Sequence, residues 1–185
     1  MRRLNQICRR FTAATQGVAA IEFAMILPVL VLIFLATFDG GRAIAAYMKM
    51  RAANYALASI TNQYPIIQSA DMTGILCAIS MVMAPYTSGT PAVKVSQVQI
   101  SNKGVATIEW SAAQSTTART VGSSITPPSA MVVNGSYLVL AEVSYTYKPL
   151  FGYFGSGSGI TFSDSLYVTP RSVSCIVYTL QSTTC

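Results

Sequence analysis

Histidine is missing from this chain of 185 residues, and charged side chains are scarce. Histidine is the commonest general base and a frequent metal ligand, so its absence removes the usual centre of acid–base and zinc chemistry. The carboxylates do not replace it, because their spacing is not that of metal ligands. There are six of them: Glu22, Asp39, Asp71, Glu109, Glu142 and Asp164. The sequence therefore predicts no metal site and no cofactor.

Motifs of covalent catalysis and phosphate binding are also missing. The nucleophile-elbow pattern Gly-x-Ser-x-Gly does not occur, and its nearest approach, residues 155–159, has glycine at the nucleophile position. That stretch is typical of a flexible low-complexity loop. Glycine-rich phosphate cradles are absent as well. We therefore expect a protein that is not an enzyme.

Basic charge is concentrated at the N-terminus. Four arginines precede the first acidic residue and supply most of the net charge of +6; they are Arg2, Arg3, Arg9 and Arg10. This asymmetry predicts a cytoplasmic N-terminus and a C-terminal part on the other side of a membrane. The basic residues after Arg51 are scattered singly rather than clustered with aromatic residues, so no nucleic-acid partner is expected.

A long apolar run follows the basic segment. Residues 18–38 contain one ionisable group, the carboxylate of Glu22, and the run has about the ~20 residues that a helix needs to cross a bilayer. A carboxylate at the bilayer centre costs roughly 2.5–3.5 kcal/mol on insertion scales, and less near the interface. Two interpretations stay open: Glu22 lies shallow enough to reach headgroup water, or it meets a positive charge after assembly.

A cleaved secretory signal peptide is the chief alternative for this segment. The apolar region of a signal peptide spans about 7–15 residues and ends at a small-x-small site. The run found here is longer and leads into Phe38-Asp39-Gly40. We therefore expect the helix to be retained as a single-pass anchor.

The beginning of the apolar run carries a motif. From Gly17 the chain reads GVAAIEFAMILPVL, and FDGGR follows from Phe38. After a short basic leader, this pattern resembles the type IV pilin class of signal, in the variant of the TadE-like pseudopilins of the tight-adherence (Flp) pilus system. The resemblance implies that a prepilin peptidase cuts between Gly17 and Val18, with Phe23 as part of the recognised context. It also implies that Glu22, then the fifth residue, pairs with the new α-amino group of a neighbouring subunit, so that each charge neutralises the other.

The C-terminal part is similar to TadE-like sequences more loosely, through Trp110, residues 122–127, residues 142–150 and Pro170-Arg171. The resemblance implies a minor pilin-like subunit that works with other pilins or pseudopilins and the pilus assembly machinery, and that is pilus-associated after processing. It also implies that the anchor lies in a bacterial inner membrane, with the C-terminal domain in the periplasm. Two alternatives stay open. One is an uncleaved scaffold of the same machinery, and the other is a tethered ligand-binding domain, for which the sequence offers no convergent polar cluster.

The apolar helix is expected to continue well beyond the membrane. Between Val18 and Asn62 it would be about 68 Å long, and Tyr64-Pro65 would end it. Pro28 predicts a kink, and Gly40-Gly41 predicts a flexible joint, although both are also compatible with an ordinary anchor. Beyond the joint, five side chains share an apolar arc: Ile44, Tyr47, Met48, Ala52 and Tyr55. The expected divisions are a leader at 1–17, the helix at 18–63 and a domain at 64–185.

The domain is predicted to be α+β, so that the whole chain is a long pilin-like helix followed by a small antiparallel sheet with one or two short helices. Asp71 would cap a short helix ending at Met83, with Ile75, Leu76, Ile79 and Val82 on its buried side. Strands are expected at 92–100, 105–112, 136–148, 160–170 and 173–178, the fourth at an edge because of Pro170. A phase shift between Val95 and Val98 indicates a bulge.

Cysteines bear on the compartment. Cys8 lies in the basic leader and would leave with it, whereas Cys77, Cys175 and Cys185 fall on the translocated side, where disulfides form. Three cysteines allow one bridge and one leftover thiol. A Cys175–Cys185 bridge, a Cys77–Cys175 bridge and no bridge all stay open at this point.

Overall fold

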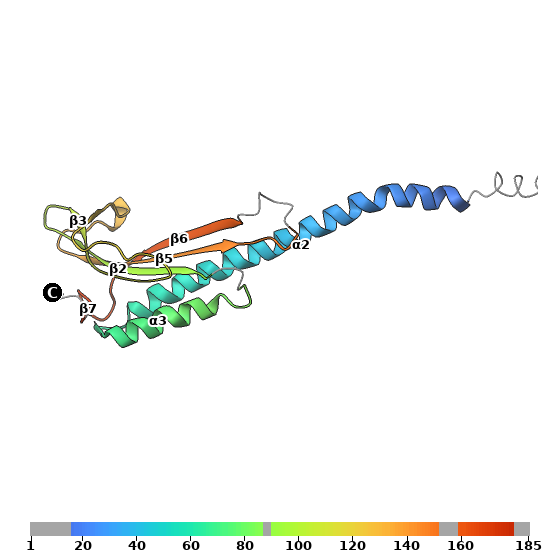
Figure 1. Ribbon diagram of the computed structural model, residues 1–185. Coiled ribbons are helices and arrows are strands. Elements are labelled where there is room, and N and C mark those ends of the chain that lie inside the picture. Colours follow the sequence, from blue (N-terminus) through green and yellow to red (C-terminus); the bar gives the residue numbers. More distant parts are fainter. Residues whose placement is uncertain (1–15, 87–89, 152–158, 180–185) are drawn as a thin grey trace, which may run out of the picture. The chain divides into compact units, whose positions relative to one another are not determined.

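The computed structural model describes residues 16–86, 90–151 and 159–179 (Figure 1). The chain divides into two compact units, Met1–Arg42 and Ala43–Cys185. A single helix, α2 (Gln16–Thr61), contributes to both units. Because the units are separate bodies, each is described by itself.

The first unit consists of the N-terminal part of α2. Its apolar side chains are exposed, including those of Ile21 (64%) and Phe34 (68%). The helix is continuous through Pro28, Gly40 and Gly41, so the chain does not melt locally at these residues. Their role as a kink and a joint stays a prediction.

The second unit is built on a five-stranded antiparallel sheet with the strand order β4-β3-β2-β5-β6. The strands are β2 (Ala92–Ile100), β3 (Ala106–Gln114), β4 (Ser124–Ile125), β5 (Tyr137–Tyr147) and β6 (Ile160–Val168). The short helix α3 (Ser69–Val82) and the C-terminal half of α2 cover one face of this sheet (Figure 1). A parallel pair, β1 (Ile66–Ile67) with β7 (Val177–Tyr178), and the turn η1 (Ser129–Met131) complete the unit. The predicted α+β fold class is confirmed, and β6 lies at a sheet edge as predicted.

The helix α2 packs on the sheet through a stripe of small and medium side chains. Ala46, Met50, Ala53 and Leu57 are completely buried. The apolar arc noted in the sequence is not this contact: Ile44, Met48 and Tyr55 are 53–62% exposed, and the ring of Tyr47 meets that of Phe162 edge-on, with centroids 5.6 Å apart. Alanine lets a helix approach a sheet closely, so the stripe with the alanines becomes the contact and the bulky arc stays outside.

The beginning of α3 differs from the prediction. Asp71 is not the N-cap, because the helix begins at Ser69 after Gln68, and Asp71 lies in its first turn, where a carboxylate is still favoured by the helix dipole. The physical reason is the preceding pair β1–β7, which holds the chain extended only as far as Ile67. Ile75, Leu76 and Ile79 are buried as predicted, with Met72. Val82, in contrast, is 40% exposed.

The predicted bulge is confirmed, and it anchors the C-terminal segment. The register between β2 and β3 slips after Gln97, which lies opposite Trp110, so that Glu109 is the extra residue. Both partners are fully buried. The Ile176 amide donates to Gln97 Oε1 at 2.8 Å, and Trp110 Nε1 donates to the Ile176 carbonyl at 2.8 Å. Because these bonds use both backbone groups of Ile176, the expected strand 173–178 is reduced to Val177–Tyr178.

A second, smaller core lies on the outer face of the sheet. This core explains why the alternation of apolar residues along β2 shifts by one position: Val93 and Val95 face the helices, whereas Val98 and Ile100 face the smaller core. Leu138 and Leu140 of β5 join it, and residues from the segment between β3 and β5 cover it. Residues 123–131, which include β4 and η1, thus cover this core through Ile125 and Met131.

We expect Gly159→Ala to destabilise the domain more than Gly122→Ala. Both glycines have φ near +80°, where an L side chain is strained. A Cβ at Gly159 would lie 2.6 Å from the carbonyl oxygen of Tyr147, whereas a Cβ at Gly122 would meet nothing within 4 Å. The expected cost is about 1 kcal/mol at Gly122 and at least ~2 kcal/mol at Gly159. Thermal unfolding of the two variants measures the difference, and equal melting temperatures would contradict this assignment.

Candidate functional site

The residues of the expected processing motif lie in the first turns of α2. Val18 and Phe23 are 55% and 59% exposed, and Glu22, one turn after Val18, is exposed as well. A Cβ on Gly17 would have nothing within 4 Å. Residues 1–15 of the predicted leader lie outside the described residues. The helix therefore presents Glu22 on a surface that is otherwise apolar and accessible.

The apolar part of α2 has the properties of a membrane anchor. Gly17–Thr61 is, in the described part of the chain, one helix long and apolar enough to cross a membrane. None of its most apolar 18-residue stretch is buried. Exposed apolar side chains in such number are unfavourable in water. This stretch therefore requires lipid or other protein chains around it.

The cysteines differ in state. Cys77 is a half-buried free thiol, whereas Cys175 is buried and disulfide-bonded. The Cys77–Cys175 bridge is therefore not formed. Cys8 and Cys185 lie outside the described residues, and the Cys175–Cys185 bridge stays a proposal that the free thiol of Cys77 supports.

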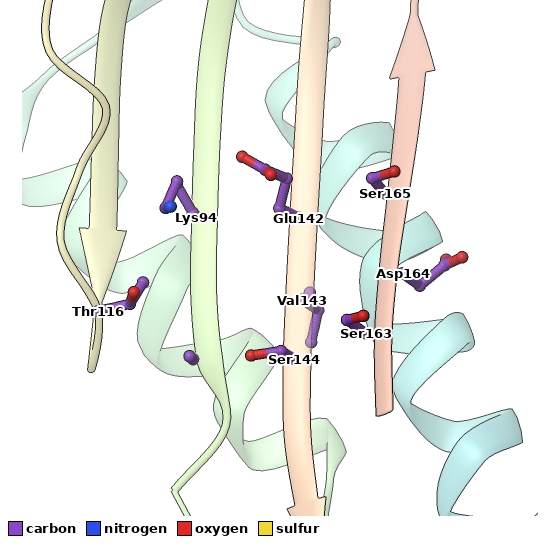
Figure 2. A pocket seen from close by; sticks show the side chains of 9 residues that line it. Lys94, Thr116, Glu142, Val143, Ser144, Ser163, Asp164 and Ser165 are labelled. Atoms are coloured by element: carbon purple, nitrogen blue, oxygen red, sulfur yellow. The ribbon is translucent and has the colours of Figure 1, made fainter. Parts of the chain in front are cut away.

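A polar depression of about 290 Å³ lies on the outer face of the sheet, beside the small core (Figure 2). Two rows of side chains cross β2, β5 and β6 there. The first row is Lys94, Glu142 and Ser165, and the second is Ala92, Ser144 and Ser163. Thr116, from the segment after β3, lines the same depression. The short side chains of the second row leave the space that makes the surface concave.

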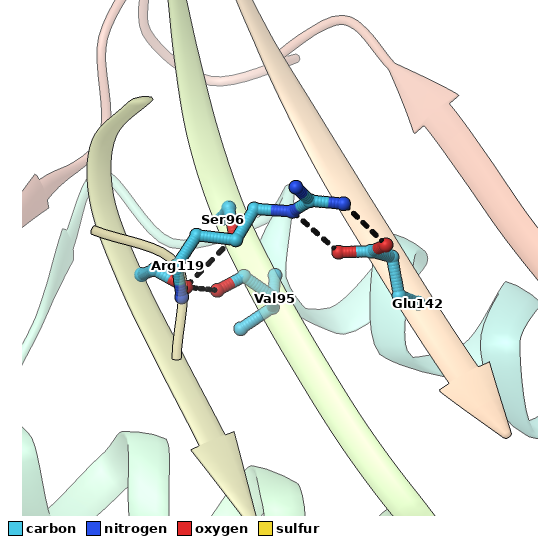
Figure 3. A network of polar contacts seen from close by, with 5 residues as sticks. Val95, Ser96, Arg119 and Glu142 are labelled. Atoms are coloured by element: carbon cyan, nitrogen blue, oxygen red, sulfur yellow. Dashed lines mark hydrogen bonds and ion pairs between the residues drawn. The ribbon is translucent and has the colours of Figure 1, made fainter. Parts of the chain in front are cut away.

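The carboxylate of Glu142 is held by an arginine that reaches across β2 (Figure 3). Arg119 Nε and one terminal nitrogen donate to the two carboxylate oxygens at 2.9 and 2.7 Å. The Arg119 backbone amide in turn donates to Ser111 Oγ at 3.0 Å, which fixes the segment on the sheet. The hydrogen bond to Glu142 raises the pKa of Arg119, and burial raises the pKa of the nearby Tyr167 hydroxyl. Arg119 thus holds the Glu142 carboxylate in one position in the wall of the depression.

The sequence did not indicate this cluster. The alternation of Glu142 and Ser144 with apolar residues is visible in the sequence, but only the sheet register brings them beside Lys94, Ser163 and Ser165. The sequence offered no convergent polar cluster, and the strand register in the folded domain assembles one. Nothing in the sequence around Arg119 indicates its partner, which is 23 residues away. In the described residues, no group of three or more acidic or cysteine side chains could hold a metal ion.

Comparison with known proteins identifies the N-terminal part of the chain. Neither the curated proteins nor the solved structures give a match. Residues 17–58 match the family described as TadE-like protein. The match begins at the glycine of the expected processing motif and covers most of the helix. The chain therefore carries a TadE-like domain at residues 17–58, in the form of a pilin-like apolar helix.

Proposed function

We propose that the protein is a pilin-like subunit that helps to assemble a tight-adherence pilus at the bacterial inner membrane. The TadE-like match implies the context of the tight-adherence pilus machinery, whose TadE-like members are generally not enzymes. One observation carries the proposal: residues 18–38 of α2, an exposed apolar stretch, contain a single carboxylate, Glu22, one turn after Val18. Prepilin peptidase and neighbouring pilins are the partners that this arrangement requires.

The proposed mechanism is assembly by helix packing. Cleavage after Gly17 would create a protonated α-amino group on Val18, in the same apolar layer as Glu22. A charge in lipid is costly when alone and tolerable when it is paired with an opposite charge. Pairing of Glu22 with the terminus of an adjoining subunit would therefore stabilise the assembled helices and set their axial register.

An uncleaved scaffold of the same machinery is the second candidate. It would have the same topology and the same exposed helix, but it would retain the four arginines of the leader. These arginines would hold the N-terminus in the cytoplasm and prevent transfer of the helix into a filament. The identity of the mature N-terminal residue therefore distinguishes the two functions.

We expect the mature protein from cells that express the pilus system to begin at Val18. Edman or mass-spectrometric analysis of its N-terminus would detect this. Gly17→Leu should yield a precursor that retains Met1, because glycine directly precedes the proposed cleaved bond. The added side chain has room in the helix, so misfolding would not explain the loss. Gly41→Leu, also on an uncrowded glycine, is the matched control and should be cut normally. Retention of Met1 in the wild-type protein would overturn the pilin mechanism and leave the scaffold.

A further inference from the structure

We propose that the polar depression on the outer face of the sheet binds one anionic sugar unit, that is, a polyhydroxyl ring carrying a carboxylate or a phosphate. This inference goes beyond the proposed function and does not depend on leader processing. It rests on the shape, the charge and the hydrogen-bonding groups of the depression.

The shape follows from the register of three strands. Ser144 lies between Ala92 on β2 and Ser163 on β6, and this row of short side chains forms the floor. Thr146 and Thr161 follow in the next row, with their hydroxyl oxygens 2.9 Å apart. At about 290 Å³ the depression lies at the lower end of the range for ligand sites, which suits a single ring rather than a long apolar ligand.

The charged side chains that line the depression are one cation, Lys94, and two carboxylates, Glu142 and Asp164. Glu142 and Arg119 neutralise each other through their two-point contact. Asp164 also lines the site, but its carboxylate points away toward α2 and accepts a hydrogen bond from Asn54 Nδ2 at 3.0 Å (Figure 2). Lys94 lies beside Glu142 in the first row and makes no hydrogen bond or ion pair with the described residues. One ammonium group therefore stays available for an anion.

The remaining groups suit a polyhydroxyl ligand. Thr116, Ser144, Ser163 and Ser165 bring four hydroxyls to the wall and floor, and each can donate and accept a hydrogen bond. The half-buried ring of Tyr167 lies on the same face, two residues after Ser165 on β6. A bare inorganic anion would leave most of these hydroxyls unused, so we infer a sugar that carries the anion.

The test uses full-length protein in micelles of a polyoxyethylene detergent, because detergents with sugar headgroups would compete. Glucuronate, glucose 6-phosphate, glucose and inorganic phosphate are titrated separately and followed by the amide NMR signals of Ser144 and Ser163. We expect the two anionic sugars to bind with a Kd on the order of 1 mM. Glucose and inorganic phosphate should each bind at least tenfold more weakly. If only glucuronate binds, the ligand is a sugar with a carboxylate. If only glucose 6-phosphate binds, the ligand is a phosphorylated sugar.

Matched variants test the residues. Lys94→Met keeps an aliphatic side chain and removes the charge, so it should weaken the binding of anionic sugars at least tenfold. Lys103→Met, in the turn between β2 and β3, should leave that binding unchanged. Ser163→Asp, on an exposed residue, introduces a repelling carboxylate and should abolish binding even if Lys94→Met fails to fold. The proposal is overturned if no probe shifts these signals, if inorganic phosphate binds as well as the sugars, or if both lysine variants behave alike.

Discussion

Glu22→Gln is expected to abolish filament assembly while leaving membrane insertion intact. Glutamine has nearly the same shape as glutamate, and its neutral amide is cheaper to place in lipid, so the anchor itself should insert as well or better. What disappears is the proposed attraction to the α-amino group of the neighbouring subunit. Removing one partner of a buried ion pair costs about 3–5 kcal/mol, which corresponds to more than about a hundredfold in the association constant.

Two measurements and two controls separate assembly from insertion. Immunoblots of sheared filaments report assembly, and alkaline extraction of membranes reports insertion. Glu22→Asp retains the charge on a side chain one methylene shorter and should keep part of the assembly. Asp71→Asn neutralises an exposed carboxylate on α3 and should change nothing. Normal filaments with Glu22→Gln would remove the pairing mechanism.

Trp110→Ala is expected to lower the free energy of unfolding of the domain by about 3–5 kcal/mol. The indole is completely buried, packs against the ring of Tyr178 with centroids 5.4 Å apart, and donates to the Ile176 carbonyl at 2.8 Å. Its removal creates a large cavity and leaves that carbonyl without its donor. Since domains are stable by only about 5–15 kcal/mol, much of the stability should be lost.

Trp110→Phe separates packing from hydrogen bonding. Phenylalanine fills much of the cavity but cannot donate to the Ile176 carbonyl, so the expected loss is about 1–3 kcal/mol. Near-ultraviolet circular dichroism during thermal unfolding measures both variants. If Trp110→Phe were as stable as the wild type, the Ile176 contact would not anchor the C-terminal segment.

Local patterns predicted the secondary structure well where a segment is long or strictly alternating. β2 occupies the predicted residues 92–100, and β5 differs from its prediction by one residue at each end. Prediction failed where contacts with a distant segment of the chain decide the local structure. The last strand is short because Ile176 is bonded to Gln97 and Trp110. The apolar arc of α2 did not reveal the buried stripe, because side-chain size as well as polarity decides which side of the helix fits the sheet.

The processing motif and the polar depression also differ in how far the sequence alone predicts them. The processing motif at Gly17, Val18, Glu22 and Phe23 is contiguous, so a reader of the sequence alone can find it. The polar depression is assembled from β2, β5 and β6, which are joined by long connections. Its charge balance depends on the pairing of Arg119 with Glu142, a contact between segments that have no common pattern.

By itself, the sequence determined the long apolar helix, the lone carboxylate of residues 18–38 and the strands that follow, because helix and strand formation depend on the periodicity of neighbouring side chains. Tertiary structure decided which face of α2 is buried, how the C-terminal segment is held, and that Lys94 lies beside a row of hydroxyls with no ion-pair partner among the described residues. These features arise from strand register and close packing, which join residues that are far apart in the chain.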